Sequence, residues 1–265
     1  MPNNSNPLSA AHQAELRARY AGVKLDDCYV YHWFDLPDGT ELVGSWDLRQ
    51  HWRDYLGHFD FSGQRVLEPG PASGFLSLKM EALGADLVAF DLPPGTAPDL
   101  LPLPSIPVEQ VRKQQASAID RVRNSWWYVH RLFGSQNKAA YGSIYQLPDC
   151  LGRFDVSVFG AILLHLANPF AALQAAAAIT DRAIIVTDLF AEHLADRAVM
   201  EFAPDAGGNN PMGWWLISPL AVTRMLTALG FPNIRVLHHQ HRHHPSLKRE
   251  EFTTGTFFTV VATRV

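Results

Sequence analysis

Residues 65–91, with the sequence RVLEPGPASGFLSLKMEALGADLVAFD, decide the fold of this chain. The segment begins with a short apolar run that ends on an acid, Glu68, and continues through a turn of small residues at 70–74. Apolar residues then recur at helical spacing as far as Gly84, where a helix is expected to end. A second apolar run ends on Asp91. Strand, glycine turn, helix and carboxylate-tipped strand together predict the first half of a nucleotide-binding α/β sheet.

The spacing of the small residues discriminates between nucleotide cofactors. Gly70 and Gly74 allow the backbone to approach a ligand closely, and Asp91 can accept both hydroxyls of a ribose. A dinucleotide fingerprint requires G-x-G-x-x-G, but Ala72 occupies its second glycine position and Phe75 its third. The segment therefore disfavours NAD. An ordinary strand–turn–helix connection that binds no ligand remains the alternative.

Composition places the chain among ordinary globular proteins. It has 265 residues, of which 47% are hydrophobic and 18% charged, enough for one large domain with a full core. The net charge of −4 gives no basic signature for nucleic acid. Cys28 and Cys150 have no metal-ligand spacing, and the amino-terminal residues do not resemble a signal peptide. We therefore expect a cytoplasmic protein that uses no metal and does not associate with a membrane.

The segment before residue 65 differs from the rest in its pattern of secondary structure and its many aromatic residues. A helix is expected at 10–20, a β-hairpin at 29–43 around the turn Pro37-Asp38-Gly39, and helical structure at 46–49 and 51–56. Its aromatic residues either cover a substrate or pack on the edge of the sheet. We expect residues 1–60 to form a helix and an aromatic cap, and residues 61–265 to form the cofactor-binding domain, with an insertion at 93–138.

Strands and helices alternate through the rest of the chain, which predicts a largely parallel sheet with helices on both faces. A proline-rich stretch after Asp91 leads into a helix with apolar residues from Val108 to Phe133. The segment 238–244, HHQHRHH, is interpreted as a solvated, pH-sensitive loop between the last two strands, with metal binding as the alternative. The expected strands are 139–141, 154–159, 183–187, 234–237 and 257–262.

A second motif lies at the fourth strand. The run 152–169, GRFDVSVFGAILLHLANP, resembles the fourth-strand motif of class I S-adenosylmethionine (SAM) methyltransferases, and Glu68-x-Gly70-x-Ala72-x-Gly74 with Asp91 resembles their first two motifs. The nearest group includes the tRNA wobble-uridine carboxymethyltransferases and uncharacterised relatives, which share segments like 210–218. The resemblance implies a Rossmann-like sheet of seven strands whose last two form an antiparallel pair.

The same resemblance implies the cofactor site. Residues of the glycine turn would surround the amino-acid part of SAM, Asp91 would bind the ribose, and Leu92 would pack on adenine. Gly142-Ser143-Ile144 replaces the aspartate that many relatives use for the adenine amino group, so Ser143 or a backbone group must substitute. The residues assigned to the cofactor are Glu68, Gly70, Pro71, Ala72, Gly74, Asp91, Leu92, Ser143, Ile144, Gly160 and Ala161.

Transfer of a methyl group from a sulfonium mainly requires alignment, and a base only where the acceptor must lose a proton. The candidate bases are His165, His32 and His130, each with a structural histidine as the alternative. Asp188 and Glu192 follow the fifth strand, where residues that face an acceptor cluster, but both are interpreted as solvated loop acids. The aromatic residues expected to line a substrate pocket are Trp33, Trp126, Trp127, Trp214 and Trp215.

These features favour a SAM-dependent methyltransferase that acts on a small or medium-sized, aromatic or apolar organic acceptor. The alternatives are an RNA-modifying or carboxymethyl-transferring enzyme that uses carboxy-SAM, and a non-catalytic SAM-binding protein. We expect no membrane partner and no nucleic acid. An aromatic cap of this kind could equally serve as the surface of a homodimer.

Overall fold

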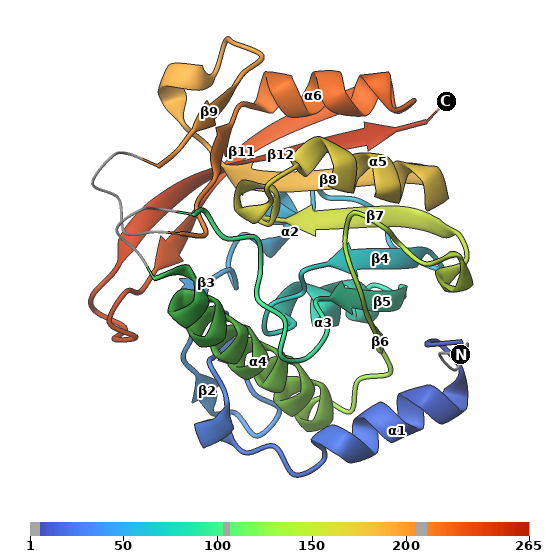
Figure 1. The fold of residues 1–265 in the computed structure, drawn as a ribbon, viewed down its shortest axis with the longest axis vertical. Helices are drawn as coiled ribbons and strands as arrows, with labels where there is room; N and C mark the ends of the chain where they lie inside the picture. Colours follow the sequence, from blue (N-terminus) through green and yellow to red (C-terminus); the bar gives the residue numbers. More distant parts are fainter. Residues whose placement is uncertain (1–5, 103–106, 205–210, 265) are drawn as a thin grey trace.

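One eight-stranded sheet organises the chain in a computed structural model, which describes residues 6–102, 107–204 and 211–264 (Figure 1). The order of its strands is β3-β11-β12-β8-β7-β4-β5-β6. Five neighbouring strands run parallel, and the other three form an antiparallel end. The parallel strands are β4 (Arg65–Pro69), β5 (Asp86–Asp91), β6 (Lys138–Tyr141), β7 (Phe154–Gly160) and β8 (Thr180–Leu189).

The antiparallel end contains one strand more than the sequence predicted. β12 (Thr253–Thr263) pairs with β8 and with β11 (Asn233–His243), which confirms the expected antiparallel pair. The eighth strand, β3 (Trp46–Asp47), pairs with the far edge of β11. The prediction of helix at 46–49 was therefore wrong. Only two residues pair, a signal too short to stand out in a sequence.

The histidine-rich segment is also part of this end, so its interpretation as a solvated loop was wrong. All of 238–243 lies in β11, paired residue for residue with 253–258 of β12. His239 and His241 point to the same side of the strand and are buried, as is His244 just beyond it. A strand places alternate side chains on opposite faces, which a composition of histidine alone does not reveal.

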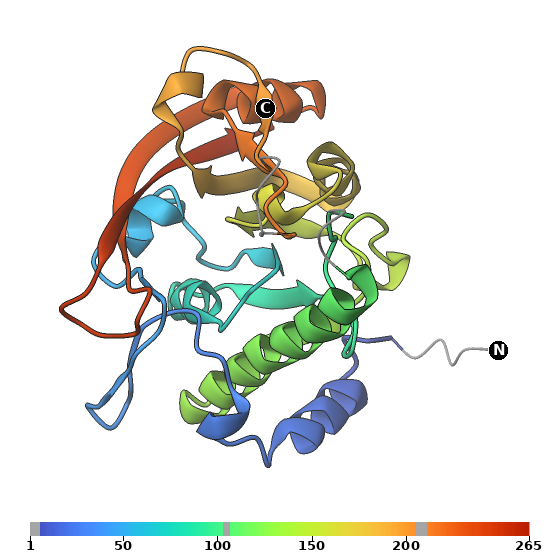
Figure 2. The ribbon, with the colours of Figure 1, turned by 60° about the vertical axis from the view of Figure 1, so that its left-hand side comes forward.

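Helices cover both faces of the sheet, as Figures 1 and 2 show. α3 and α4 pack against Val158 and Ile185 on one face, whereas α5 and α6 pack against Ile184 and Val186 on the other. Ser218 and Asn168 cap α6 and α5 by accepting hydrogen bonds from backbone N–H groups, and a proline follows each cap. The helices are α1 (Ala10–Tyr20), α2 (Trp52–Tyr55), α3 (Phe75–Ala82), α4 (Val108–Leu132), α5 (Pro169–Ile179) and α6 (Pro219–Ala228).

Short elements complete the fold. The predicted hairpin forms from β1 (Phe34–Asp35) and β2 (Glu41–Leu42), and β9 (Met200–Phe202) pairs with β10 (Trp215–Ile217). Within the described residues, no helix is long and apolar enough to span a membrane. Four 3₁₀ turns are η1 (Leu25–Asp27), η2 (Asp149–Leu151), η3 (Leu163–His165) and η4 (Glu192–Leu194).

Candidate functional site

The carboxyl end of β4 is the point at which the chain changes direction across the sheet. β5 lies on one side of β4 and β7 on the other, so the loops that follow these strands diverge there. In open α/β sheets, such a switch point leaves a crevice that suits a ligand. The glycine turn, Asp91 and Gly160 all lie at this edge, because they directly follow or end β4, β5 and β7.

The turn after β4 has the backbone that its glycines predict. Gly70, Ala72 and Gly74 have positive φ angles of 67°, 48° and 86°. A side chain on Gly70 would place its Cβ 2.2 Å from Cδ1 of Ile162, and one on Gly74 would place it 2.8 Å from Cδ1 of Trp126. Both glycines are therefore favoured by conformation, and Gly74 also by the space that the Trp126 ring leaves. Ala72 adopts the left-handed conformation without that freedom, a strain found mainly at functional sites.

Glu68 lies under the turn and not at its surface. Its side chain is buried and accepts a hydrogen bond from the Ser77 hydroxyl, which in turn accepts one from Trp126 Nε1 at 3.3 Å. Burial raises the pKa of Glu68 to about 7, and the hydrogen bond from Ser77 opposes that rise. These contacts favour a role for Glu68 in positioning the turn.

Asp91 ends β5 beside the turn, and one carboxylate oxygen accepts a hydrogen bond from the Leu92 N–H at 2.8 Å. Burial raises the pKa of Asp91, and the nearby positive charge of Arg123 opposes the rise. Arg123 is itself buried, donates to the Leu92 carbonyl at 2.8 Å and pairs with Asp120. The insertion helix α4 therefore holds the Asp91–Leu92 corner in place.

The remaining residues assigned to the cofactor follow β6 and β7. The N–H of Gly142 donates to the carbonyl of Asp91 at 2.9 Å, which brings the Ser143–Ile144 segment to the same edge. Ala161 has a positive φ of 48°, and its N–H donates to Thr187 at 2.7 Å. Gly160, Ala161 and Ile162 are all partly exposed. The backbone after β7 thus faces the turn from the opposite side of the switch point.

The three candidate histidines do not come together. His165 ends η3, and its Nδ1 donates to the Met212 carbonyl at 2.9 Å, so Nε2 carries the lone pair; burial lowers its pKa. His32 is buried against Phe75, and burial lowers its pKa to about 3. His130 lies near the C-terminal end of α4, bonded to the carbonyl that precedes β6. Its ring also packs on Trp126, with ring centroids 4.9 Å apart.

The predicted pocket tryptophans lie in four different places. Trp126 packs on the glycine turn, whereas Trp127 stacks on Tyr20 of α1 with ring centroids 5.0 Å apart. Trp33, in the amino-terminal segment expected to form a cap, is buried beside His244, with ring centroids 4.9 Å apart. Trp214 and Trp215 donate from their indole nitrogens to the carbonyls of Asp99 and Leu166, beside the loop after β7.

A buried carboxyl group at the same edge was not foreseen from the sequence. Asp188, at the end of β8, is buried and accepts hydrogen bonds from the backbone of Leu164 and Leu189 at 3.3 and 2.8 Å. Burial raises its pKa to about 7, so its interpretation as a solvated acid was wrong. Its charge contributes to the raised pKa values of Tyr31 and Tyr55, which burial mainly causes. The position of Asp188 at the end of a predicted strand was the sequence feature that could have indicated its burial.

The cap is fixed to the glycine turn. The N–H groups of Tyr31 and His32 both donate to the Ser73 hydroxyl, at 3.0 and 2.9 Å. Ser73 is fully buried within the turn. From the sequence, Ser73 is only a small residue of the turn, so its link between the turn and the amino-terminal hairpin was not predicted.

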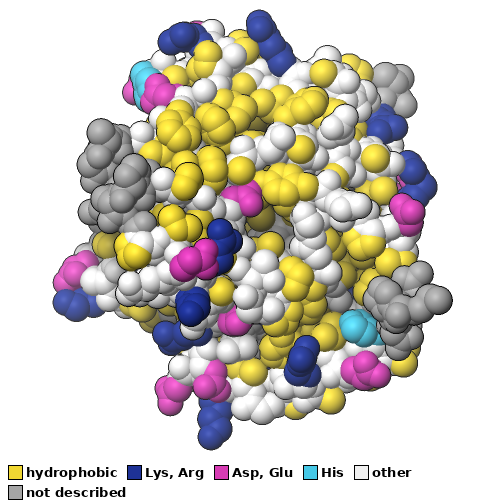
Figure 3. Space-filling model, viewed as in Figure 1, with side chains coloured by type: hydrophobic (Ala, Val, Ile, Leu, Met, Phe, Trp, Pro, Cys, Tyr) yellow, Lys and Arg dark blue, Asp and Glu magenta, His cyan; other side chains and the backbone are white. Residues whose placement is uncertain are grey.

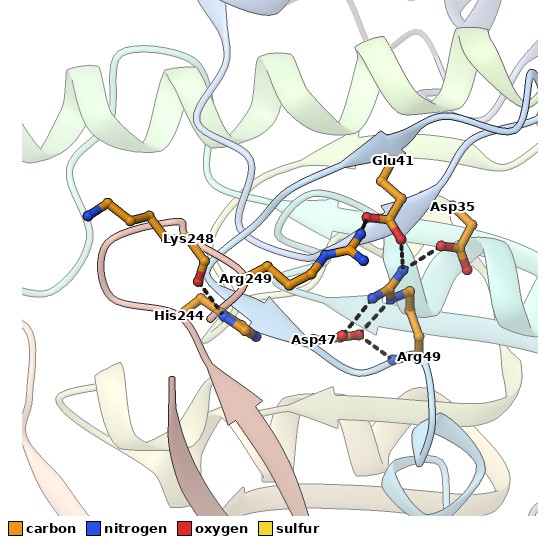
Figure 4. A network of polar contacts seen from close by, with 7 residues as sticks. All are labelled: Asp35, Glu41, Asp47, Arg49, His244, Lys248 and Arg249. Carbon is orange, nitrogen blue, oxygen red and sulfur yellow. Dashed lines mark hydrogen bonds and ion pairs between the residues drawn. The ribbon is translucent and has the colours of Figure 1, made fainter. Parts of the chain in front are cut away.

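Ion pairs hold the outer end of the cap to the loop after β11 (Figure 4). Arg49 pairs with Asp35, Glu41 and Asp47 at 2.5–3.1 Å, and Glu41 also pairs with Arg249. The guanidinium groups of Arg49 and Arg249 lie 4.8 and 5.6 Å from the ring of Trp33. Two arginines that share one indole and one carboxylate are hard to replace singly by lysine.

No group of three metal-ligating side chains suited to an ion occurs among the residues that the structure describes. In β11, His239 and His241 instead share a hydrogen bond of 2.7 Å, and His239 also contacts the Thr259 hydroxyl at 2.8 Å. Burial lowers the pKa of His239 to about 4 and that of His241 to about 3. Both imidazoles are therefore neutral near pH 7.

This pair makes the fold sensitive to acid. The unfolded chain binds protons at these imidazoles near pH 6.5 and the folded chain does not, so their contribution to stability falls as the pH drops below 6.5. The raised pKa values of Glu68 and Asp188 have the opposite effect, because they stabilise the folded chain as the pH falls. The contribution of one imidazole is therefore measured with the variant His241→Asn. Between pH 7.5 and 5, its free energy of unfolding should fall by about 2 kcal/mol less than that of the wild type.

Urea unfolding at the two pH values measures that difference. The matched control is His238→Asn on the same strand, since His238 is exposed. Its pH dependence should follow the wild type. Equal pH dependence of His241→Asn and the wild type would contradict a neutral, buried pair.

On the face shown in Figure 3, acidic and basic side chains lie singly or in adjacent pairs of opposite sign. Hydrophobic side chains occupy much of the area between them. This face therefore presents no continuous basic patch of the kind that binds a nucleic-acid backbone.

The chain is similar in structure to known proteins. The N-terminal domain of EvdMO1 with S-adenosylhomocysteine (SAH) bound is 17% identical, with a TM-score of 0.56 over 99% of this chain and 100% of that domain. A 1,6-didemethyltoxoflavin N1-methyltransferase from Burkholderia thailandensis is 14% identical, with a TM-score of 0.45 over 98% of this chain and 92% of that one. No protein-family model and no curated protein matches the chain. The likeness to the EvdMO1 domain establishes a shared fold. In this chain, that fold is built on a Rossmann-like sheet.

Proposed function

We propose that this chain is a SAM-dependent methyltransferase that acts on a small or medium-sized organic acceptor. The glycine turn at the switch point carries the proposal. Gly70, Ala72 and Gly74 have positive φ angles in the turn after β4, and Asp91 ends the neighbouring strand β5. An adenosyl ligand requires such a turn beside such a carboxylate. The fold shared with a domain that holds SAH supports the same cofactor.

The residues fit that cofactor. The turn, including Pro71, would surround its amino-acid part, Asp91 would accept the ribose hydroxyls, and Leu92 with Ser143–Ile144 would border the adenine. Gly160 and Ala161 would border the sulfur end. When bound, SAM supplies an activated methyl group on a sulfonium, and the protein must align the acceptor with it. Glu68 would act only as a positioning residue beneath the turn.

We propose that His165 serves as the acceptor-side base where the acceptor must lose a proton. It lies in the loop after β7, is neutral, and has Nε2 free of the hydrogen bond that orients the ring. His32 is the second candidate, since it borders Ser73 of the turn. His130 is not retained, because its Nε2 is engaged by the Asn137 carbonyl just before β6.

The cap and the insertion would then enclose the acceptor. We propose residues 1–60 as the cap and residues 61–265 as the cofactor-binding domain, with an insertion at 93–138. Trp126, Trp214 and Trp215 lie close enough to the carboxyl edge to favour an aromatic or apolar acceptor. A cytoplasmic location and a homodimer remain part of this proposal.

Calorimetric titration of the wild type with SAM, SAH, carboxy-SAM and NAD tests the proposal. We expect micromolar Kd values for SAM and SAH and at least tenfold weaker binding of carboxy-SAM and NAD. Tighter binding of carboxy-SAM would instead favour carboxymethyl transfer. Absence of SAM and SAH binding at millimolar ligand would overturn the assignment of the cofactor.

A further inference from the structure

A cavity of about 320 Å³ lies between the C-terminal turns of α1 and α4. Figures 1 and 2 show these two helices side by side at the bottom of the molecule. Residues assigned to the cofactor do not line it. Its main lining residues are Arg17, Tyr20, Trp127, His130, Ser135 and Gln136.

One wall of the cavity is aromatic and held rigidly. The rings of Tyr20 and Trp127 are stacked, with centroids 5.0 Å apart and planes within 5°. Trp127 Nε1 donates to the Tyr141 hydroxyl at 2.8 Å, which fixes the indole. Arg131 donates to the carbonyls of Tyr20, Ala21 and Val23, so the end of α1 is fastened to α4. This wall offers a preformed surface for a flat apolar group.

The polar side of the cavity carries an available positive charge. The guanidinium of Arg17 forms no hydrogen bond or ion pair with any residue that the structure describes, although its charge lowers the pKa of His130. Burial is the main cause of that lowered pKa, so His130 is neutral. The carboxylate of Glu81, whose charge acts on His130, already accepts hydrogen bonds from Ser135 Oγ at 2.7 Å and the Gln136 N–H at 2.6 Å.

We propose that this cavity is a second ligand site, which binds a small aromatic carboxylate. The ring of the ligand packs against the Tyr20–Trp127 wall, and its carboxylate pairs with Arg17, whose planar guanidinium can bind both oxygens. A volume of about 320 Å³ is at the small end of ligand pockets and suits one or two rings. This site would give a role to Trp127 and His130 of α4, which have none in the proposed cofactor site.

Calorimetry with benzoate and indole-3-carboxylate tests the site, with benzamide as the uncharged probe. We expect both acids to bind the wild type with low-millimolar Kd values or better, and benzamide to bind at least fivefold more weakly. Arg17→Ala should weaken binding of the acids at least fivefold. Arg19→Ala, an exposed arginine in the same helix turn, is the matched control and should bind them as the wild type does.

Thermal unfolding of both variants verifies that α1 remains docked. Absence of benzoate and indole-3-carboxylate binding, equal binding of benzamide and benzoate, or unchanged binding by Arg17→Ala would each overturn the proposal. SAM binding is measured separately on the same samples. Absence of SAM binding by the wild type would contradict the proposed function but not the second site. The second site contains none of the residues assigned to the cofactor.

Discussion

Replacing Asp91 with alanine is expected to weaken SAM binding by about 100-fold. Hydrogen bonds to a charged group contribute about 1.5–3 kcal/mol each, and a ribose offers two hydroxyls, so a loss of about 3 kcal/mol is reasonable. Asp91 is suited to this role because Arg123 and Asp120 of α4 fix its corner of the chain. The measurement is calorimetric titration of the variant with SAM and with SAH.

Asp86→Ala is the control for this prediction. Asp86 begins the strand that Asp91 ends, is exposed, and pairs with Lys138 at 2.6 Å. The control should bind SAM within twofold of the wild type. We expect Asp91→Ala to remain folded, because its carboxylate is partly desolvated and accepts only the hydrogen bond from Leu92 among the bonds described. A folded Asp91→Ala that binds SAM normally would exclude Asp91 as the ribose ligand.

Gly44→Ala is expected to have the largest effect on stability of the single methyl additions considered. Its Cβ would lie 2.2 Å from the carbonyl oxygen of His32, a backbone atom that a rotamer change cannot move. The clash separates two paired segments, since His32 forms a bridge with Trp46. We expect a loss of about 3 kcal/mol in the free energy of unfolding and a fall in Tm of about 6 °C. Urea unfolding and calorimetry measure both.

The matched control is Gly22→Ala. No atom lies within 4 Å of the position that its Cβ would take, and its φ is not positive. The control should differ from the wild type by less than about 0.5 kcal/mol. If both variants unfold alike, the close approach at Gly44 is not a constraint on the cap.

The parallel part of the sheet could be predicted from the sequence because each strand there is a buried apolar run between turn signals. β4, β5 and β7 are buried along nearly their whole length. α5 and α6 begin at local caps, Asn168 and Ser218. The glycine turn was equally readable, since its conformation is a property of residues 70–74 themselves.

The antiparallel end could not be predicted in the same way. β11 has a mostly exposed, polar face, and its histidines are buried only because the partner strand and α2 cover them. β3 exists only as a pair of residues on β11. In both cases the strand is defined by a partner distant in the sequence and not by its own pattern.

The candidate site divides along the same line. Local motifs identified the turn, Asp91 and the loop after β7. The burial of Asp188 and the link from Ser73 to the cap depend on tertiary packing. The packing of α4 sends neighbouring residues to different places, since Trp126 lies against the glycine turn whereas Trp127 stacks on Tyr20 of α1.

The ion pairs around Trp33 also determine when the molecule can be completed during synthesis. Glu41 and Arg249 are 208 residues apart in the chain, and β3 has no strand to pair with until β11 has been made. At about 5–20 residues per second, a ribosome needs roughly 10–40 s to make that intervening stretch. The aromatic hairpin therefore leaves the ribosome long before Arg249 and β11 do, and it finds these partners only when they emerge.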